Sequence, residues 1–233
     1  MRAGLLAGIG LAMSLIVFGV AAQSLLVADT HISDANVIAA VRQFYGQAGA
    51  ERTQAWRKLV RQAKSQHLSE RELLSRVNIF FNRLRFIDDI ALWGKPDYWA
   101  TPLEFLGVGG GDCEDFSVAK YQTLRELGIE DAKLRLVYVK ALTLNQFHMV
   151  VAYYPTPAAV PYILDNLEGS IRLASERRDL VPIYSFNGQH LWLMQERGQG
   201  QVAGQASRLS VWNELRGRID TDRLQQPKMN LDH

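Results

Sequence analysis

The chain contains one cysteine, and its neighbours suggest that this thiol could be reactive. The segment reads Gly109-Gly110-Gly111-Asp112-Cys113-Glu114-Asp115-Phe116, and a helix is predicted from about Cys113 to Leu127, with Gly128 as its C′ residue. Backbone N–H groups at a helix start are unpaired and partly positive, which lowers the pKa of a thiol there. The glycines would allow a tight turn and the close approach of a substrate backbone. Cys113 is therefore a candidate nucleophile; the alternative is an incidental cysteine at a capped helix start.

A nucleophilic thiol needs a base, and the base needs a group that orients it. His148 opens a predicted strand 35 residues after Cys113 (148 − 113), and Asp165 ends a short apolar strand 17 residues later (165 − 148). This spacing favours His148 as the base over His190, which opens a later hairpin strand, with Asp165 as the orienting group. A lone aspartate at the end of an apolar strand is also a common turn residue.

Three carboxylates, Asp112, Glu114 and Asp115, lie within two residues of Cys113. Without compensation they would raise the pKa of the thiol and oppose thiolate formation. A hard cation bound by their oxygens would cancel this effect, and such ligands suit Ca²⁺, whereas the lack of cysteine and histidine ligands argues against zinc. The alternative is that Asp112 or Asp115 only caps the helix and Glu114 is solvated.

The elements that must position these residues predict an α+β fold. Apolar residues recur at helical spacing over residues 34–86, and Ser69 and Glu72 form a capping box within this region. After the Cys113 helix the period changes to that of strands. Strands are expected at residues 134–141, 148–154, 162–165, 181–186 and 190–194, with residues 197–208 as a mobile segment and a short helix after Ser210. The cysteine-bearing helix is expected to pack on an antiparallel sheet, with a helical lobe before it.

Composition excludes several classes of protein. The chain has 233 residues, 48% of them hydrophobic and 9% aromatic, which excludes disorder over the whole chain. Its net charge is only +2, and a nucleic-acid-binding protein would normally carry a larger basic excess. One cysteine cannot form an intramolecular disulfide or a cysteine-rich zinc site.

The first 22 residues resemble an export signal. Arg2 precedes an uncharged stretch from Ala3 to Val20, and small residues follow at Ala21 and Ala22. The alternative is an uncleaved membrane anchor, because the apolar run is about 20 residues long. In a bacterium both would place the rest of the chain in the periplasm. The expected organisation is 1–22 signal or anchor, 30–195 catalytic domain with a helical lobe, and 196–233 flexible tail.

The motifs resemble those of a known family. A helix-borne cysteine followed by histidine and aspartate on successive strands is similar to the transglutaminase-like cysteine proteinases of the papain-like superfamily, in particular the LapG-type bacterial members. The segments that carry the resemblance are Asp97–Pro102, Gly110–Asp115, Phe147–Val150 and Ile163–Asn166. The resemblance covers residues 30–195, and no motif can be matched beyond about Gly198.

This resemblance implies a papain-like or transglutaminase-like core and a calcium-dependent endopeptidase. It implies a large surface adhesin (LapA-like) as substrate, cleaved near its N-terminal retention module at a di-alanine site to release cells from a biofilm. It also implies an inner-membrane cyclic di-GMP receptor (LapD-like) as the inhibitor, bound through an apolar groove near the cysteine helix. Trp93 and Tyr98 are candidates for exposed residues of this groove, with core packing as their alternative. Metal ligands would be Asp112, Glu114 and Asp115.

The oxyanion donors and the acyl acceptor stay open. The Cys113 backbone N–H is the natural first donor. Because the superfamily often places a polar or aromatic side chain upstream of the cysteine, the Trp99 indole is a second candidate, with core packing as its alternative. A transglutaminase or deamidase would use the same triad and thioester chemistry, and a non-enzymatic calcium-binding adaptor is the third reading.

Overall fold

The structure is a computed structural model that describes residues 33–194, 200–219 and 223–232. The predicted signal segment, residues 1–22, lies outside the described residues. Within the described ranges, no helix combines the length and the hydropathy needed to cross a membrane.

The described chain folds into helices first and strands later, with a last helix after the strands. The helices are α1 (Asp34–Tyr45), α2 (Gln47–Ser65), α3 (Glu70–Phe81), α4 (Asp89–Leu92), α5 (Pro102–Val108), α6 (Cys113–Glu126) and α7 (Ser210–Ile219). The strands are β1 (Arg85–Phe86), β2 (Gly110–Gly111), β3 (Leu134–Ala141), β4 (Gln146–Tyr153), β5 (Tyr162–Leu164), β6 (Arg172–Leu173), β7 (Leu180–Phe186), β8 (His190–Leu193) and β9 (Gln201–Gln205). Short 3₁₀ turns η1 (Asp131–Lys133), η2 (Ala174–Glu176) and η3 (Ala206–Arg208) complete the order.

Seven strands form one antiparallel sheet in the order β6-β5-β4-β3-β7-β8-β9. The central pair is β3 and β4, in which Val139 lies opposite His148. Strand β5 pairs with the other edge of β4, so the residue that follows β5 is near the strand that carries His148. The predicted order of His148 and Asp165 on neighbouring strands is therefore confirmed.

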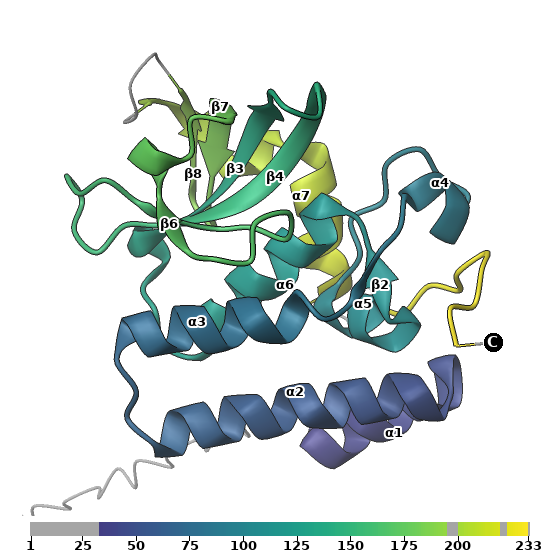
Figure 1. The fold of residues 1–233 in the computed structure, drawn as a ribbon. Coiled ribbons are helices and arrows are strands. Elements are labelled where there is room, and N and C mark those ends of the chain that lie inside the picture. Colours follow the sequence, from purple (N-terminus) through teal and green to yellow (C-terminus); the bar gives the residue numbers. More distant parts are fainter. Residues whose placement is uncertain (1–32, 195–199, 220–222, 233) are drawn as a thin grey trace, which may run out of the picture. The chain divides into compact units, whose positions relative to one another are not determined.

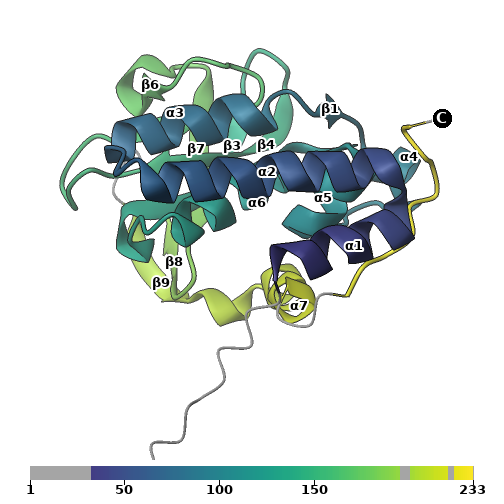
Figure 2. The same ribbon diagram turned by 90° about the horizontal axis from the view of Figure 1, so that it is seen from below.

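The helices cover one face of this sheet in two layers. Helix α6 contacts β3 and β4, and α3 packs against α6. Helices α1 and α2 pair with each other on the side of α3 and α6 that is farther from the sheet (Figures 1 and 2). A core of buried aliphatic and aromatic side chains joins these layers, and Phe105, Phe116 and Leu134 are among its fully buried members.

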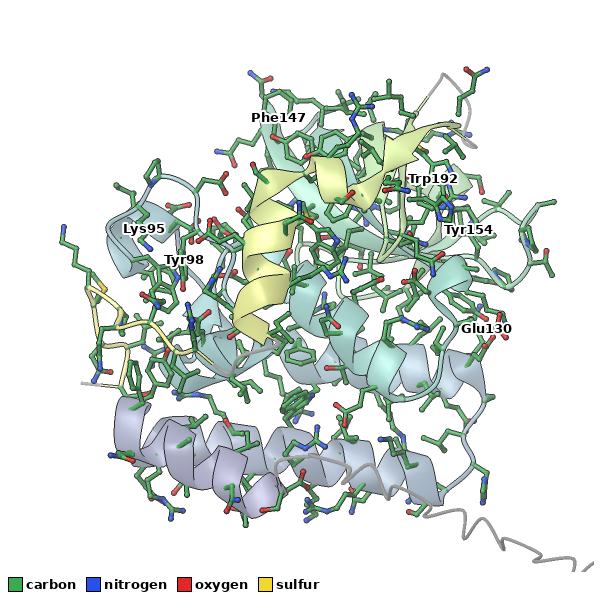
Figure 3. The ribbon with its side chains drawn as sticks, turned by 180° about the vertical axis from the view of Figure 1, so that it is seen from behind. Lys95, Tyr98, Glu130, Phe147, Tyr154 and Trp192 are labelled. Atoms are coloured by element: carbon green, nitrogen blue, oxygen red, sulfur yellow. The ribbon has the colours of Figure 1, made fainter. Side chains whose placement is uncertain are left out.

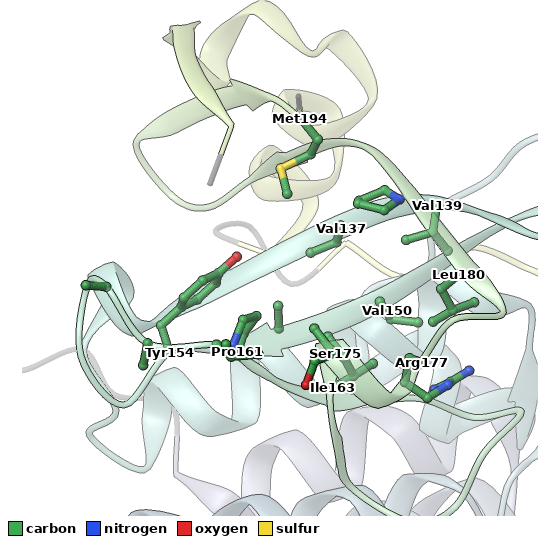
Figure 4. A pocket seen from close by; sticks show the side chains of 16 residues that line it. Val137, Val139, Val150, Tyr154, Pro161, Ile163, Ser175, Arg177, Leu180 and Met194 are labelled. Carbon is green, nitrogen blue, oxygen red and sulfur yellow. The ribbon is translucent and has the colours of Figure 1, made fainter. Parts of the chain in front are cut away.

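The other face of the sheet carries a smaller apolar cluster built mostly from valines. Val137, Val139, Val150 and Ala152 are buried there, and they line an apolar cavity of about 570 Å³ (Figure 4). The two faces of the sheet are thus both apolar in their centres, which explains the near-continuous burial along β4.

The predicted helices and strands are largely confirmed, including the capping box of Ser69 and Glu72 and the left-handed glycine at position 128. Helix α5 was not expected, although Thr101 and Glu104 form a second capping box with Pro102 at the first helical turn. This signal lay directly before the glycines, which suggested a loop.

The described residues after 196, predicted as a flexible tail with a possible short helix, contain that helix, α7, and also a strand, β9, that was not predicted. Strand β9 extends the sheet, and Trp212 and Leu215 of α7 are buried in the core. After α7, the Gln225 backbone N–H donates to the Glu104 carboxylate, and the Tyr45 hydroxyl donates to the carbonyl of Gln225. The segment packs because its apolar residues complete the core beside α6.

Candidate active site

Cys113 is the first residue of α6, as predicted, and its side chain is partly buried. Its thiol lies 3.0 Å from Glu114 Oε2, to which it donates a hydrogen bond. A backbone hydrogen bond also joins the thiol to Met149, the residue after His148. Helix α6 is fixed to β4 at this point because the Ser117 hydroxyl donates to the Met149 carbonyl at 2.9 Å. The start of α6 is therefore brought next to the strand that carries His148.

The glycines before Cys113 allow the predicted tight turn, but the close contacts that they permit are with the chain itself. A Cβ on Gly111 would lie 2.1 Å from the Asp115 carboxylate, and a Cβ on Gly110 would lie 2.6 Å from the carbonyl of Arg85. Gly109 ends α5 in the left-handed region, with φ 85°. The glycines allow the chain to approach its own α6 and β1, so the close contacts found here are internal ones.

His148 and Asp165 form a buried pair with each other, as predicted. His148 Nε2 and Asp165 Oδ1 are 2.7 Å apart, and the two residues are 4% and 1% exposed. Asp165 Oδ1 also accepts from the Leu167 backbone N–H, and Oδ2 accepts from Arg177 Nη2 at 2.8 Å. Since Nε2 is hydrogen-bonded to the carboxylate, Nδ1 is the ring nitrogen that remains to accept a proton from a thiol.

The environment of Asp165 strongly favours its charged form. Burial by itself would raise the pKa of this carboxyl, but hydrogen bonds from His148, Leu167 and Arg177 outweigh burial and lower the pKa to about 2. Asp165 is therefore a permanent anion at neutral pH. This is the property that a group needs in order to hold an imidazole in one tautomer.

The thiol has the opposite environment. Burial raises the pKa of Cys113 far above its ordinary value, and the nearby carboxylates Glu114 and Asp112 raise it further. The start of α6 was predicted to lower the pKa of the thiol. In the protein without a bound cation, burial and two adjacent carboxylates have a larger effect and raise it. The structure therefore supports the prediction that the neighbouring acids oppose thiolate formation.

The acidic residues form a larger cluster than the sequence indicated, which we call the acidic cluster: Asp89, Asp97, Asp112, Glu114 and Asp115. Ligand atoms within 4.8 Å of one another occur in two all-carboxylate groups, Asp89-Asp112-Asp115 and Asp89-Asp97-Glu114, and in a third group, Asp112-Cys113-Glu114. Asp89 and Asp97 were missed because they come from α4 and the following loop, far from Cys113 in sequence. The one available signal for Asp89 was a second acidic residue after Asp88 in an otherwise apolar stretch.

The acidic cluster contains buried carboxylate oxygens that lack a hydrogen-bond partner: Oδ1 of Asp89, Oδ1 of Asp112 and Oδ2 of Asp115. The alternative that Asp112 caps α6 is not borne out, because its side chain makes no capping hydrogen bond although it occupies the N-cap position. Asp115 instead accepts from the backbone N–H of Ala100 at 2.6 Å. Buried oxygens without partners are rare and costly, so these residues fit a hard cation.

The pKa values of the acidic cluster agree with this shortage of positive charge. Burial, together with Asp115 and Glu114, raises the pKa of Asp112 to about 11. Burial raises the pKa of Asp89 to about 7, with further contributions from Glu114 and Asp97. The pKa of Asp115 is also raised well above its usual range, chiefly by burial.

A cleft of about 510 Å³ lies beside Cys113. Asp97, Asp112 and Glu114 line it together with the thiol, and the rings of Tyr138, Phe147 and Tyr184 line it as well. The Tyr138 ring stacks between Phe147 and Tyr184, with centroid distances of 5.3 and 5.0 Å. Phe147 is 59% exposed and lies at the edge of the molecule (Figure 3). The cleft therefore combines an acidic part with an aromatic strip.

The remaining candidates from the sequence have other surroundings. The Trp99 indole N–H donates to Asp97 Oδ1 at 3.0 Å while its ring stacks on Phe186, so it packs in the core and also lines the cleft. His190 is exposed, and its ring contacts Trp192. Trp93 and Tyr98, the candidates for an exposed groove, are buried at 7% and 4% exposure, so the alternative of core packing holds for both. The Tyr98 ring packs under Lys95 (Figure 3), and its hydroxyl donates to Glu104.

Comparisons with known proteins found matches in sequence and in overall structure. The sequence profile of bacterial transglutaminase-like cysteine proteinases matches residues 43–193. The EGTA-treated structure of Legionella pneumophila LapG is 39% identical, with 81% of this chain and 98% of that chain covered and a TM-score of 0.70. The calcium-bound structure of the same protein is 40% identical, with 81% and 99% covered and a TM-score of 0.69. No curated protein sequence matches the chain. The expected transglutaminase-like α+β core is confirmed.

Proposed function

The chain belongs to the bacterial transglutaminase-like cysteine proteinases, and we propose that it is a calcium-dependent endopeptidase with a triad of Cys113, His148 and Asp165. The observation that carries this assignment is the buried 2.7 Å contact between His148 Nε2 and Asp165 Oδ1, on the strands beside the only cysteine of the sequence. His190, the competing base, is exposed on β8, and no hydrogen bond joins its ring to a described carboxylate.

In the proposed reaction, His148 accepts the thiol proton on Nδ1 while Asp165 holds its Nε2–H. Cys113 Sγ attacks the carbonyl carbon of the scissile peptide bond, and His148 then donates the proton to the departing amine. Water, activated by the same imidazole, hydrolyses the thioester and restores the thiol. The negative oxygen formed in both steps would lie near the Cys113 backbone N–H at the start of α6.

The acidic cluster supports calcium as the cofactor. A calcium-bound and an EGTA-treated structure exist for LapG of Legionella pneumophila, which supports the same dependence in this chain. Asp112, Glu114 and Asp115 were the ligands predicted from the sequence, and Asp89 and Asp97 are further candidates because their oxygens face the same groups. When bound, a calcium ion would supply positive charge that compensates the carboxylates beside the thiol.

For the substrate, we propose the N-terminal region of a large surface adhesin, cleaved at a di-alanine site so that cells leave a biofilm. The resemblance of the motifs carries this proposal. The cleft supports it only in a general way, because about 510 Å³ beside Cys113 gives room for several side chains of an extended peptide. Export by residues 1–22 would place the protein in the periplasm, where such an adhesin is anchored.

An inner-membrane cyclic di-GMP receptor is the proposed inhibitor, again on the strength of the resemblance. Since Trp93 and Tyr98 are buried, the exposed rings that line the cleft, Phe86 and Phe147, are the ones that such a partner could contact. The periplasmic part of the receptor should retain the protein in a pull-down at micromolar concentration, and Phe147→Ser should weaken retention. If the wild-type protein does not bind, the regulatory proposal fails and the catalytic one is unaffected.

The catalytic proposal is tested by incubating the purified protein with the N-terminal region of a large surface adhesin from the same organism, with calcium or with EGTA. Mass spectrometry should find two fragments with calcium, none with EGTA, and none with Cys113→Ala in either condition. A single product of higher mass would instead identify an acyl transferase, and a product heavier by one mass unit a deamidase. An intact substrate that is retained by both the wild type and Cys113→Ala would identify a binding protein.

A further inference from the structure

The two oxygens of the Asp165 carboxylate are held by different partners. Oδ1 accepts from His148 and from the Leu167 backbone, while Oδ2 accepts from Arg177 Nη2 at 2.8 Å. A carboxylate can rotate about its Cβ–Cγ bond. A hydrogen bond to Oδ2 therefore fixes the carboxylate plane and, with it, the position of Oδ1 relative to the imidazole. Arg177 is the one described side chain other than His148 that hydrogen-bonds this carboxylate.

Arg177 is itself fixed from its other side. Its Nε donates to Asp179 Oδ1 at 3.0 Å and its Nη2 to Asp179 Oδ2 at 2.7 Å, so the two side chains meet as a planar fork. Asp179 is partly exposed and its backbone carbonyl accepts from Leu142, which ties this contact to the end of β3. The guanidinium therefore has one orientation before it meets Asp165.

The position of Arg177 in the fold prevents it from turning to solvent. The residue follows η2 and is 7% exposed, and it contributes to one end of the apolar cavity on the far face of the sheet (Figure 4). Moving the guanidinium into this cavity would place a charge among apolar side chains, at a high desolvation cost. Burial and the Asp179 fork thus both keep Nη2 on Asp165.

A second basic side chain, Lys120 of α6, lies near Asp165. It is 1% exposed, burial lowers its pKa to about 7, and its protonated form interacts with Asp165 through charge. Arg177 adds what Lys120 does not: a short directed hydrogen bond to Oδ2. A second anion, Asp179, accompanies Arg177, which offsets much of its positive charge at the triad. The main effect of Arg177 should therefore be geometric.

We propose that Arg177 is a positioning residue for the triad, which fixes the plane of the Asp165 carboxylate and, through it, the tautomer and ring orientation of His148. The proposal rests on the proposed function in so far as that function assigns Asp165 and His148 to the triad. Arg177 does not contact the thiol, and its effect on the reaction passes entirely through Asp165.

The test compares Arg177→Gln and Arg177→Lys with Arg172→Gln, a matched loss of an exposed arginine that pairs with Glu168. With saturating calcium and the adhesin fragment, Arg177→Gln should lower kcat by about 10- to 100-fold with KM changed by less than about twofold, because misplacement of the reacting groups affects the chemical step. Arg177→Lys should recover part of kcat, since it keeps one donor but cannot form the fork with Asp179. Arg172→Gln should match the wild type.

A second readout does not depend on any substrate. In ¹⁵N-histidine NMR spectra of the calcium-loaded protein, the His148 signals, assigned by their loss in His148→Gln, should report an Nε2–H tautomer with a strongly downfield Nε2 proton. Arg177→Gln should broaden or shift this proton upfield, and Arg172→Gln should not. If the wild type fails to cleave the fragment but its His148 spectrum responds in this way, the proposed substrate is wrong and the positioning role stands.

The proposal is overturned if folded Arg177→Gln keeps kcat within about twofold of the wild type and the His148 spectrum is unchanged. If Arg177→Gln does not fold, Arg177→Lys decides: a wild-type kcat and spectrum in that variant would mean that Oδ2 needs only a nearby charge. In the first case Arg177 would serve only to anchor the segment between η2 and β7, and in the second it would supply only a charge beside Asp165.

Discussion

Carboxylates lie on two sides of Cys113, Asp165 on one side and the acidic cluster on the other, and their electrostatics are opposite. On the β5 side, Asp165 accepts from His148, Leu167 and Arg177, and its pKa is lowered to about 2. On the α4 side, the acidic cluster holds five carboxylates, three of which have a buried oxygen without a partner. The pKa of Asp112 there is raised to about 11.

The difference lies in where the compensating charge comes from. For Asp165 the chain supplies its own cation, Arg177, in a directed hydrogen bond, so this side is complete within the protein. For the acidic cluster no arginine or lysine among the described residues makes an ion pair, so this side is completed by an ion from outside. A catalytic thiol placed between the two would work only when both sides are compensated.

The largest expected effect comes from the thiol between the two groups. Cys113→Ala should lower the cleavage rate by ~10⁶-fold, because the nucleophile is lost. Neither Asp165 nor the acidic cluster needs this sulfur for its own contacts, so the variant should keep the thermal unfolding temperature and the calcium response of the wild type. If Cys113→Ala cleaves the substrate at a comparable rate, neither Asp165 nor the acidic cluster acts in catalysis through this thiol.

The next effect separates the two sides. Asp165→Asn should lower kcat by roughly 10³–10⁴-fold, because the amide favours the wrong imidazole tautomer. Calcium should still raise the unfolding temperature of this variant, since the acidic cluster is intact. His190→Ala serves as the control and should keep most of the activity, and a reversed order of the two variants would move the base to β8.

The ion pair of Asp165 should also make the free energy of unfolding depend on pH. The folded-state pKa of Asp165 is about 2, below the ordinary value of about 3.9, so its anion stabilises the fold above about pH 4. As the pH falls from 4 to 2 this contribution, about 2 kcal/mol, should be lost. Urea unfolding of the wild type and Asp165→Asn between pH 2 and 6 measures it: the difference between the two should shrink toward low pH, and a constant difference would contradict the account.

The smallest expected effect is on the acidic cluster, where loss of a carboxylate should stabilise the metal-free protein. Asp112→Asn removes one carboxyl from a group that lacks positive charge, so with EGTA present the variant should be more stable than the wild type, by about 1 kcal/mol. Asp165→Asn under the same conditions should be less stable. Chemical denaturation at pH 7 compares them, and a loss of stability in Asp112→Asn would mean that this carboxylate is already compensated in the metal-free protein.

Features that depend on local sequence could be predicted, and they include much of the site. Helix α6 followed from its apolar stripe and Gly128, the Ser69 capping box from its spacing, and the pairing of His148 with Asp165 from two strand patterns in succession. These predictions succeeded because the residues lie on or beside helices and strands whose hydrophobic periodicity is visible in the local sequence.

Features that depend on convergence of distant loops could not be predicted. Asp89 reaches the acidic cluster because α4 and the loop at Ala100 fold against the start of α6, and no periodicity signals this. Arg177 lies after a 3₁₀ turn, and no sequence pattern distinguishes it from the neighbouring Arg178. Strand β9 was hidden by its glycine and glutamine content, because pairing with β8 rather than propensity makes it a strand.

The most direct test of the central claim is a calorimetric calcium titration of EGTA-treated, then dialysed, protein at pH 7 and physiological ionic strength. Wild type and Asp165→Asn should bind calcium with the same affinity, while Asp112→Asn should bind at least about tenfold more weakly, since it loses one anionic ligand. Magnesium should bind more weakly than calcium in all three. The account is contradicted if the wild type shows no binding up to millimolar calcium, or if Asp112→Asn binds as tightly as the wild type.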